Sequence, residues 1–161
     1  AMTSQLPGKP VSKSRVQLAQ MMQPEHANNH GNVHGGWIMK MVDEAGALAC
    51  MRHAQRRVVT VAVDQMMFRQ PIRLGDLVTL NAEVSYAGRT SMEARIVVVA
   101  ENPVTGACVH TNTAYCVYVA LGDDGEPASV PPLILETDAE RQSMERAKKR
   151  QAYRLSQRDT L

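Results

Sequence analysis

The sequence predicts an α+β fold in which an antiparallel sheet wraps round one long central helix, followed by a basic C-terminal helix. Three observations lead to this prediction. Residues from Gly36 to about Ala54 are apolar on nearly every side at helical spacing, which is typical of a helix inside a protein. Segments that alternate apolar and polar residues follow it, separated by short turn sequences. The chain has 161 residues, which fits one domain, so these strands have that helix to cover.

The first elements precede the central helix. Residues 1–13 contain two prolines and a glycine and predict a flexible N-terminal arm, which leaves residues 14–161 as the single domain. A strand is expected at 14–22, where apolar and polar residues alternate. The run HANNHGNVHGG, residues 26–36, is rich in asparagine and glycine and is expected to form a loop.

The central helix and the strands after it follow from periodicity. In the helix the apolar residues recur three or four positions apart: Ile38, Met41, Val42, Ala45, Leu48 and Ala49. Strands are expected at 59–63, 78–85, 92–98 and about 107–119. Because the turns between them are short, we expect these four strands to form a meander. The meander leaves one side of the helix and one edge strand open, which predicts that a second copy of the chain covers them.

The last helix is predicted from Asp138 to Gln157, because Thr137 and Glu140 have the spacing of a capping box. The basic residues of this segment are Arg141, Arg146, Lys148, Lys149, Arg150, Arg154 and Arg158. A helix of this kind commonly presents a solvated face, and the alternative is that it attracts a phosphate-bearing ligand.

Composition narrows the classes of partner and compartment. A net charge of +2 with 4% aromatic residues does not favour nucleic acid as a partner. The sequence has no signal-peptide pattern and no apolar run of membrane-spanning length, so we expect a cytoplasmic protein without a membrane partner. The cysteines, Cys50, Cys108 and Cys116, are odd in number and lack C-x-x-C spacing, which predicts free buried thiols. Cys108 and His110 share a strand face, but no third group orients them as a nucleophilic pair.

Three histidines in the loop suggest a metal site. His26, His30 and His34 are spaced by four, which would place three imidazoles on one face of a helix. However, the asparagines and the glycine between them disfavour helix, and no H-E-x-x-H motif is present. We therefore interpret the histidines as polar loop residues and expect no metal.

Two glycines, Gly35 and Gly36, stand at the start of the helix. Glycine lets the backbone approach a ligand closely, and the first turn of a helix has unpaired N–H groups that could hold a developing oxyanion. The alternative is that these glycines serve only as a cap or as a gap for packing.

Asp43 is the one acid in the middle of the apolar helix that has no obvious partner. Lys40 is better placed to pair with Glu44 four residues later. An ionised Asp43 beside small residues on a packing face needs a partner or a function. The amide of Asn28 would lie nearby if the loop folds back. The spacing leaves open whether Asp43 is catalytic or an ordinary exposed acid.

The stretch ANNHGNVHGGWIMKMVDEAGALACMRH resembles the opening of hotdog-fold acyl-CoA thioesterases of the cytosolic acyl-CoA hydrolase type. Those proteins carry A-N-x-x-G-N-V-H-G-G, then six residues, then Asp or Glu. The stretches VTVAVDQMMFRQPIRLGDLV, YAGRTSME and VPPLILETDAERQSMERAKKR are similar to further segments of that family. The resemblance thus covers nearly the whole chain beyond the first dozen residues.

The resemblance implies a hotdog fold that dimerises into a continuous sheet, with dimers assembled three at a time into a hexamer. It implies a catalytic pair, Asn28 and Asp43, contributed by opposite subunits, and a backbone donor at Gly36 for the thioester carbonyl. It also implies contacts to the nucleotide part of coenzyme A. The residues concerned are Arg89, Thr90 and Ser91, with Lys148 and Lys149 as weaker candidates. Trp37 departs from the smaller or polar residue that many relatives carry.

The activity implied is hydrolysis of acyl-CoA to a free acid and coenzyme A, without a cofactor. Asp43 would activate water or attack the carbonyl itself, while Asn28 and the helix N-terminus polarise the thioester. Two alternatives remain. One is a non-catalytic acyl-CoA sensor on the same fold, and the other is a metal-dependent hydrolase that uses His26, His30 and His34.

Overall fold

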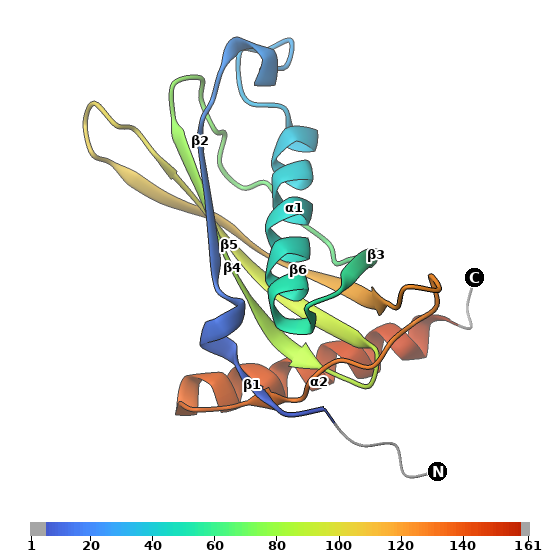
Figure 1. Cartoon of the computed structure of the whole chain (residues 1–161). Coiled ribbons are helices and arrows are strands. Elements are labelled where there is room, and N and C mark those ends of the chain that lie inside the picture. Colours follow the sequence, from blue (N-terminus) through green and yellow to red (C-terminus); the bar gives the residue numbers. More distant parts are fainter. Residues whose placement is uncertain (1–5, 159–161) are drawn as a thin grey trace, which may run out of the picture.

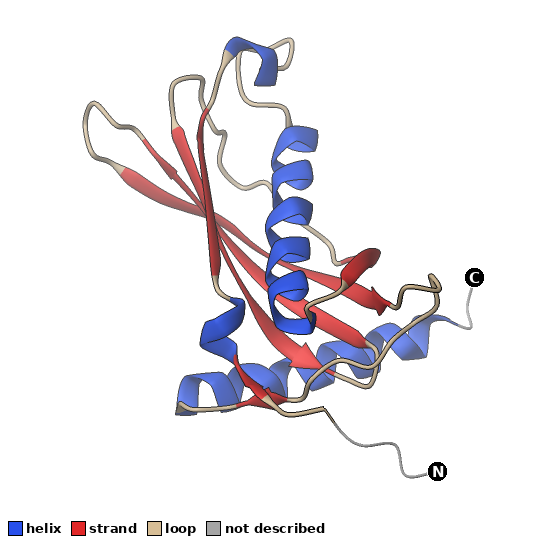
Figure 2. Ribbon diagram, in the orientation of Figure 1, coloured by secondary structure: helices blue, strands red, loops and turns tan. Residues whose placement is uncertain are grey.

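The computed structural model describes residues 6–158, in which a curled five-stranded sheet holds one long helix against its inner face (Figure 1). The helix is α1 (Gly35–Ala54). The strands are β2 (Val16–Met21), β3 (Arg57–Val63), β4 (Leu77–Ala87), β5 (Ser91–Glu101) and β6 (Cys108–Leu121). Helix α2 (Asp138–Gln157) crosses the other side of the sheet near one end (Figure 2). The predicted fold class, an antiparallel sheet wrapped round one long central helix and followed by a C-terminal helix, is confirmed.

The core lies between α1 and the inner faces of the three long strands. Alternate residues of β4 and β5, such as Val78, Leu80, Ile96 and Val98, are fully buried, as the period-two pattern predicts. The buried residues of α1 are Ile38, Met41, Val42, Ala45, Gly46, Ala49, Cys50, His53 and Ala54. Because small residues are frequent among them, the helix can approach the sheet closely.

The sheet order corrects the expected meander. The strands lie in the order β2-β4-β5-β6-β3, so β3 pairs with β6 at one edge and does not neighbour β4. Only β4, β5 and β6 are joined as consecutive neighbours. The physical reason is the connection between β3 and β4, residues 64–76, which is too long for a hairpin turn and carries the chain across to the far side of β5. Both short strands, β2 and β3, therefore lie at edges.

The segment before β2 contains a short strand and a 3-10 turn. β1 (Lys9–Pro10) pairs in parallel with β7 (Leu133–Ile134), and a 3-10 turn, Val11–Ser14, follows it. Val11 and Ser14 are buried, and the Ser14 hydroxyl accepts a hydrogen bond of 2.9 Å from the Val84 backbone N–H. Within the predicted arm, residues 9–13 thus lie in a strand and a 3-10 turn that contact the domain. Residues 1–5 of that predicted arm lie outside the described residues.

Helix α2 has the predicted bounds. Thr137 caps it by accepting a hydrogen bond from the Glu140 backbone N–H at 3.1 Å. The second half of the capping box is shifted by one residue, because the Glu140 carboxylate accepts from the Glu136 backbone N–H at 3.4 Å. Among the helices of the described residues, none combines the length and the apolar character needed to cross a membrane.

Candidate active site

Asp43 is held in place by two hydroxyl groups of the sheet. Its side chain is half-buried on α1 and faces the strand pair β3 and β6 at one edge of the sheet. The Thr60 hydroxyl donates to Asp43 Oδ1 at 2.8 Å. The Tyr118 hydroxyl lies 3.1 Å from the same Oδ1 and 2.9 Å from the Asp43 backbone oxygen. No residue among 6–158 donates a hydrogen bond to Oδ2, so this oxygen is available to a substrate or to water.

The neighbouring charges on α1 are paired as the spacing predicts. Lys40 Nζ lies 2.5 Å from Glu44 Oε1, four residues later, and its ammonium also lies over the Trp37 ring at 5.6 Å. Asp43 forms no ion pair with any described residue, since its partners are the two hydroxyls. Lys40 and Glu44 thus form an ion pair exposed to solvent, whereas Asp43 on the same helix is held by residues of the sheet.

Asn28 uses its side-chain oxygen to close the loop before α1. Asn28 Oδ1 accepts from the backbone N–H groups of His30 at 2.9 Å and Asn32 at 3.2 Å. Its amide nitrogen has no acceptor among residues 6–158 and is therefore a donor that a ligand could use. Asn28 lines a cavity of about 440 Å³ with Gly35, Phe68 and Arg69, among others. Asp43 is not part of that lining, so one protomer does not bring the predicted pair into one cavity.

Gly35 and Gly36, the predicted oxyanion donors, lie in the first turn of α1, and the Gly36 N–H already has an acceptor. His34 is the N-cap of α1, and its Nδ1 accepts from the Gly36 backbone N–H at 3.1 Å. A ligand oxygen at Gly36 would therefore share that N–H with His34 or replace it. Gly35 faces the Phe68 ring, which would lie 3.6 Å from a Cβ atom at that position. Of the two glycines, Gly35 lines the same cavity as Asn28, and Gly36 does not.

His26, the first member of the histidine run, has a structural role. Its ring is buried, its Nδ1 accepts from the Gln23 backbone N–H at 2.8 Å, and it packs edge-on against Trp37 with ring centroids 4.8 Å apart. No three His, Cys, Asp or Glu side chains within residues 6–158 are gathered closely enough to hold a metal ion. His26 and Trp37 instead fix the loop against the first turn of α1.

The cysteines differ in exposure, which corrects the prediction that all are buried. Cys50 and Cys116 are buried, whereas Cys108 is exposed near the start of β6. Burial raises the pKa of the Cys116 thiol to about 11, so this thiol stays protonated. Cys108 and His110 do not form a nucleophilic pair, because His110 contacts Thr113 at 2.9 Å and Cys108 contacts the Gly106 backbone oxygen.

The residues expected near coenzyme A lie at the end of the sheet that α2 crosses (Figure 1). Arg89 and Thr90 lie in the turn from β4 into β5, Ser91 is the first residue of β5, and the Arg89 side chain is exposed. Lys148 and Lys149 are exposed on α2, and Lys148 pairs with Glu145 at 3.2 Å. Their contacts with a nucleotide remain a prediction.

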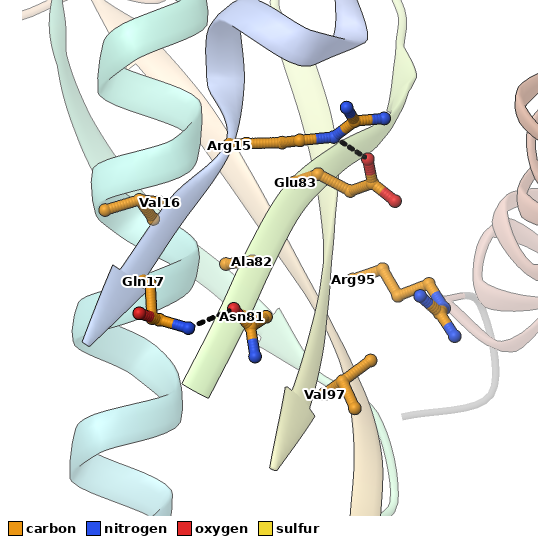
Figure 3. Close-up of a pocket in the computed structure, with 8 residues that line it drawn as sticks. All are labelled: Arg15, Val16, Gln17, Asn81, Ala82, Glu83, Arg95 and Val97. Carbon is orange, nitrogen blue, oxygen red and sulfur yellow. Dashed lines mark hydrogen bonds and ion pairs between the residues drawn. The ribbon is translucent and has the colours of Figure 1, made fainter. Parts of the chain in front are cut away.

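A separate cavity of about 410 Å³ lies against the outer face of β2, β4 and β5 (Figure 3). Arg15 pairs there with Glu83 at 3.1 Å, and Gln17 donates to Asn81 at 3.0 Å. None of the residues predicted to be catalytic lines it, and Asp43 lies on the opposite side of the sheet. Because Asp43 lies beside the β3 edge, we place the candidate active site there and not in this cavity.

Sequence reasoning missed Thr60 and Tyr118. The alternating pattern indicates only that Thr60 is a polar residue of a strand and that Tyr118 belongs to a long strand. A hydroxyl that alternates with valines, in a strand that follows an apolar helix with an unpaired acid, is a weak signal for Thr60. No local signal marks Tyr118, because its contact depends on which strand lies under Asp43.

Comparison with known proteins gives a consistent picture. The model of the thioesterase superfamily matches residues 30–107. The cytosolic acyl coenzyme A thioester hydrolase of Rattus norvegicus is 33% identical over 142 residues, which cover 87% of this chain and 37% of that protein. The chain therefore spans less than two thirds of the length of this relative.

Two solved structures align over nearly the full length. The structure of an apo hexameric acyl-CoA thioesterase aligns with a TM-score of 0.90 and is 32% identical in sequence. The alignment covers 94% of this chain and 97% of that protein's chain. The acyl-CoA hydrolase of Staphylococcus aureus in complex with butyryl coenzyme A, coenzyme A and coenzyme A disulfide has a TM-score of 0.84 at 32% identity, with 96% of each chain covered. That hydrolase has also been solved as three mutants, in which an aspartate, an asparagine or a threonine is replaced by alanine.

Proposed function

The chain belongs to the thioesterase superfamily, among the hotdog-fold acyl-CoA thioester hydrolases, and from this premise we propose that it hydrolyses acyl-CoA to a carboxylic acid and coenzyme A. The observation that carries the proposal is the state of Asp43. Two hydroxyls hold one of its carboxylate oxygens, and the other has no donor among residues 6–158. An acid oriented in this way suits proton abstraction or nucleophilic attack.

In the proposed reaction, Asp43 Oδ2 accepts a proton from water as the water oxygen bonds to the acyl carbon. The carbon–sulfur bond then breaks, and the thiolate of coenzyme A takes up the proton. Direct attack by Asp43 would instead form an acyl anhydride, which water hydrolyses to the same products. The free amide nitrogen of Asn28 and the first N–H groups of α1 would donate to the carbonyl oxygen as its charge develops.

The proposal includes a second subunit, because one protomer leaves the pair apart. β3 is an edge strand next to Asp43, and its valines, Val59, Val61 and Val63, are 42%, 54% and 43% exposed. Edge strands with exposed apolar residues favour pairing with another chain. We propose that β3 pairs with its copy, so that Asn28 of the partner subunit approaches Asp43. Assembly of three such dimers is proposed from the hexameric relative.

The activity is tested with a panel of acyl-CoA thioesters of increasing chain length, by following the released thiol with a thiol reagent. Asp43→Asn is expected to fold and assemble as the wild type does and to lose most of its turnover. The Lys40→Gln variant is a control on the same helix turn, since Lys40 contacts Glu44 and the Trp37 ring but not Asp43. Wild-type binding of acyl-CoA without thiol release would replace the hydrolase by a sensor, and full activity of Asp43→Asn would remove Asp43 from the mechanism.

The shared site is tested by mixing subunits. Asn28→Ala and Asp43→Asn are each expected to be inactive as homo-oligomers. If the pair forms across subunits, a mixed dimer has one site with both residues intact, so random mixing restores about a quarter of wild-type activity. Refolding the two variants together and assaying thiol release measures this recovery. No recovery in verified mixed dimers would place both residues of a site in one subunit.

A further inference from the structure

We propose that Tyr118 is a positioning residue for this hydrolysis, which together with Thr60 holds Oδ1 of Asp43 and thereby directs Oδ2 toward the reacting atoms. The inference rests on the proposed function, because it assigns Asp43 a task in which orientation matters. It concerns a side chain that lies inside the core and need not touch the substrate.

The two hydroxyls reach Asp43 from one cross-strand pair. Thr60 of β3 and Tyr118 of β6 are directly opposed in the antiparallel register, so their side chains leave the sheet on the same face. That face is the inner one, since Tyr118 is fully buried. The register shifts immediately after Thr60, between Thr60 and Ala62, so the bulge begins at the residue that contacts Asp43. The cross-strand pairing and the bulge therefore fix the positions of both hydroxyl groups relative to α1.

Gly46 provides the space that this contact requires. It lies three residues after Asp43 on α1, and it is buried against the Tyr118 ring. A Cβ atom at Gly46 would overlap the Tyr118 hydroxyl and lie 3.1 Å from both Cε2 and Cζ of the ring. Any larger residue would therefore push the hydroxyl away from Asp43. The helix accepts a glycine in its interior, although glycine weakens a helix relative to alanine.

Tyr118 acts as a donor only. Burial raises the pKa of its phenol above the ordinary value, and the nearby charge of Asp43 raises it further. The hydroxyl therefore keeps its proton near neutral pH and serves as a donor to Asp43, not as the base. The hydroxyl oxygen lies 3.1 Å from Oδ1 and 2.9 Å from the backbone oxygen of Asp43, so its single proton can be donated to either. Both acceptors belong to Asp43, so either bond restrains this one residue.

The test compares Tyr118→Phe with Tyr115→Phe. Both variants remove a phenolic hydroxyl from β6, but the Tyr115 ring lies under the Arg150 guanidinium, away from Asp43. Loss of a hydrogen bond to a charged, oriented group predicts a fall in kcat of about 10- to 100-fold for Tyr118→Phe. We expect KM to change less than about two-fold, because substrate binding does not use this hydroxyl. Tyr115→Phe is expected to keep the wild-type kcat.

A coupling experiment separates positioning from a loss of fold. Thr60→Val and Tyr118→Phe remove donors to the same oxygen, so their effects on kcat should not multiply in the double variant. Crystal structures of wild type and Tyr118→Phe give a readout that does not depend on turnover. In the variant the Asp43 carboxylate should adopt a different rotamer or several. Gly46→Ala should disturb the carboxylate in the same way.

The outcomes distinguish the inference from the proposed function. An active wild type with an unchanged kcat in Tyr118→Phe overturns the inference and leaves the hydrolase intact. A rise in KM alone, or a loss of thermal stability with kcat unchanged, also overturns it. If the wild type releases no thiol, the proposed function fails, and the Asp43 rotamer in the Tyr118→Phe structure still decides whether Tyr118 positions the carboxylate.

Discussion

Removing Glu93 is expected to destabilise the protein more than any change at a surface charge. Glu93 is completely buried on β5, where Arg150 donates to it at 2.7 and 3.0 Å and Ser85 at 2.6 Å. Arg154 also contacts Glu93, and it forms a two-pronged pair with Asp64 at 2.8 Å for each bond. This network is the main polar attachment between α2 and the sheet.

The magnitude follows from what each side chain loses. In Glu93→Ala, Arg150 and Arg154 remain largely buried, with 22% and 15% of their side chains exposed, and Arg150 loses its carboxylate partner. Breaking a buried pair from one side typically costs about 3 to 5 kcal/mol. For a chain of this size each kcal/mol shifts Tm by about 2 to 4 °C. The expected fall in Tm is therefore about 6 to 20 °C, with a smaller fall for Glu93→Gln, which keeps the shape and one acceptor.

Thermal unfolding at one fixed protein concentration measures the effect, because assembly makes Tm depend on concentration. Glu145→Ala is the matched control, since Glu145 pairs with Lys148 on α2 at 3.2 Å but is 69% exposed. An exposed pair contributes about 0.5 kcal/mol, so the control should unfold within about 2 °C of the wild type. A Glu93→Ala protein that unfolds together with the Glu145→Ala control would refute the reasoning.

Three further predictions concern groups away from Asp43. Burial holds the pKa of His53 below its ordinary value of 6.5. The imidazole therefore binds a proton in the unfolded chain at a pH at which it stays neutral in the native protein, so stability falls as pH drops through 6.5. Tm should therefore fall between about pH 7.5 and about pH 5.5, and less steeply in His53→Gln; equal slopes would contradict this. Of the thiols, Cys108 alone is expected to react rapidly with a thiol reagent in the native protein, and Cys50 and Cys116 should react after denaturation; a second rapid thiol would contradict the burial. His34→Ala removes the acceptor that caps α1 and should lower the free energy of unfolding by about 1 kcal/mol, measured by denaturant titration, and an unchanged midpoint would show that the cap contributes nothing.

The two long helices could be predicted from the sequence because the signals that define them are local. Helix α2 begins and ends at the predicted residues, since Thr137 is read directly as an N-cap and the polar pattern runs to Gln157. Helix α1 begins at Gly35, one residue before the predicted start, because His34 is its N-cap. Composition alone does not assign that position to histidine. In both cases the determining contacts lie within four residues along the chain.

The sheet order could not be obtained in this way. A period-two pattern identifies β3 as a strand but does not say which strand it pairs with. Its valines remain exposed in one protomer, whereas the same pattern in β4 is buried on one face. The difference lies in the neighbours: β4 is flanked on both sides, and β3 is an edge. Which strand becomes an edge depends on the path of residues 64–76, which no local pattern encodes.

The surroundings of Asp43 show the same limit and indicate where a usable signal lies. Asn28, Gly36 and Asp43 stand close together in the sequence, so a motif can identify them. Tyr118 contacts Asp43 only in the observed register, because a slip of one residue would turn its side chain to the other face of the sheet. Gly46 is different, since a glycine in the middle of a helix rich in alanine is unfavourable by about 1 kcal/mol relative to alanine. Such a glycine, one turn after an unpaired acid, indicates that another element approaches the helix closely at that point, and the chemistry of the acid indicates that the approaching group is a donor.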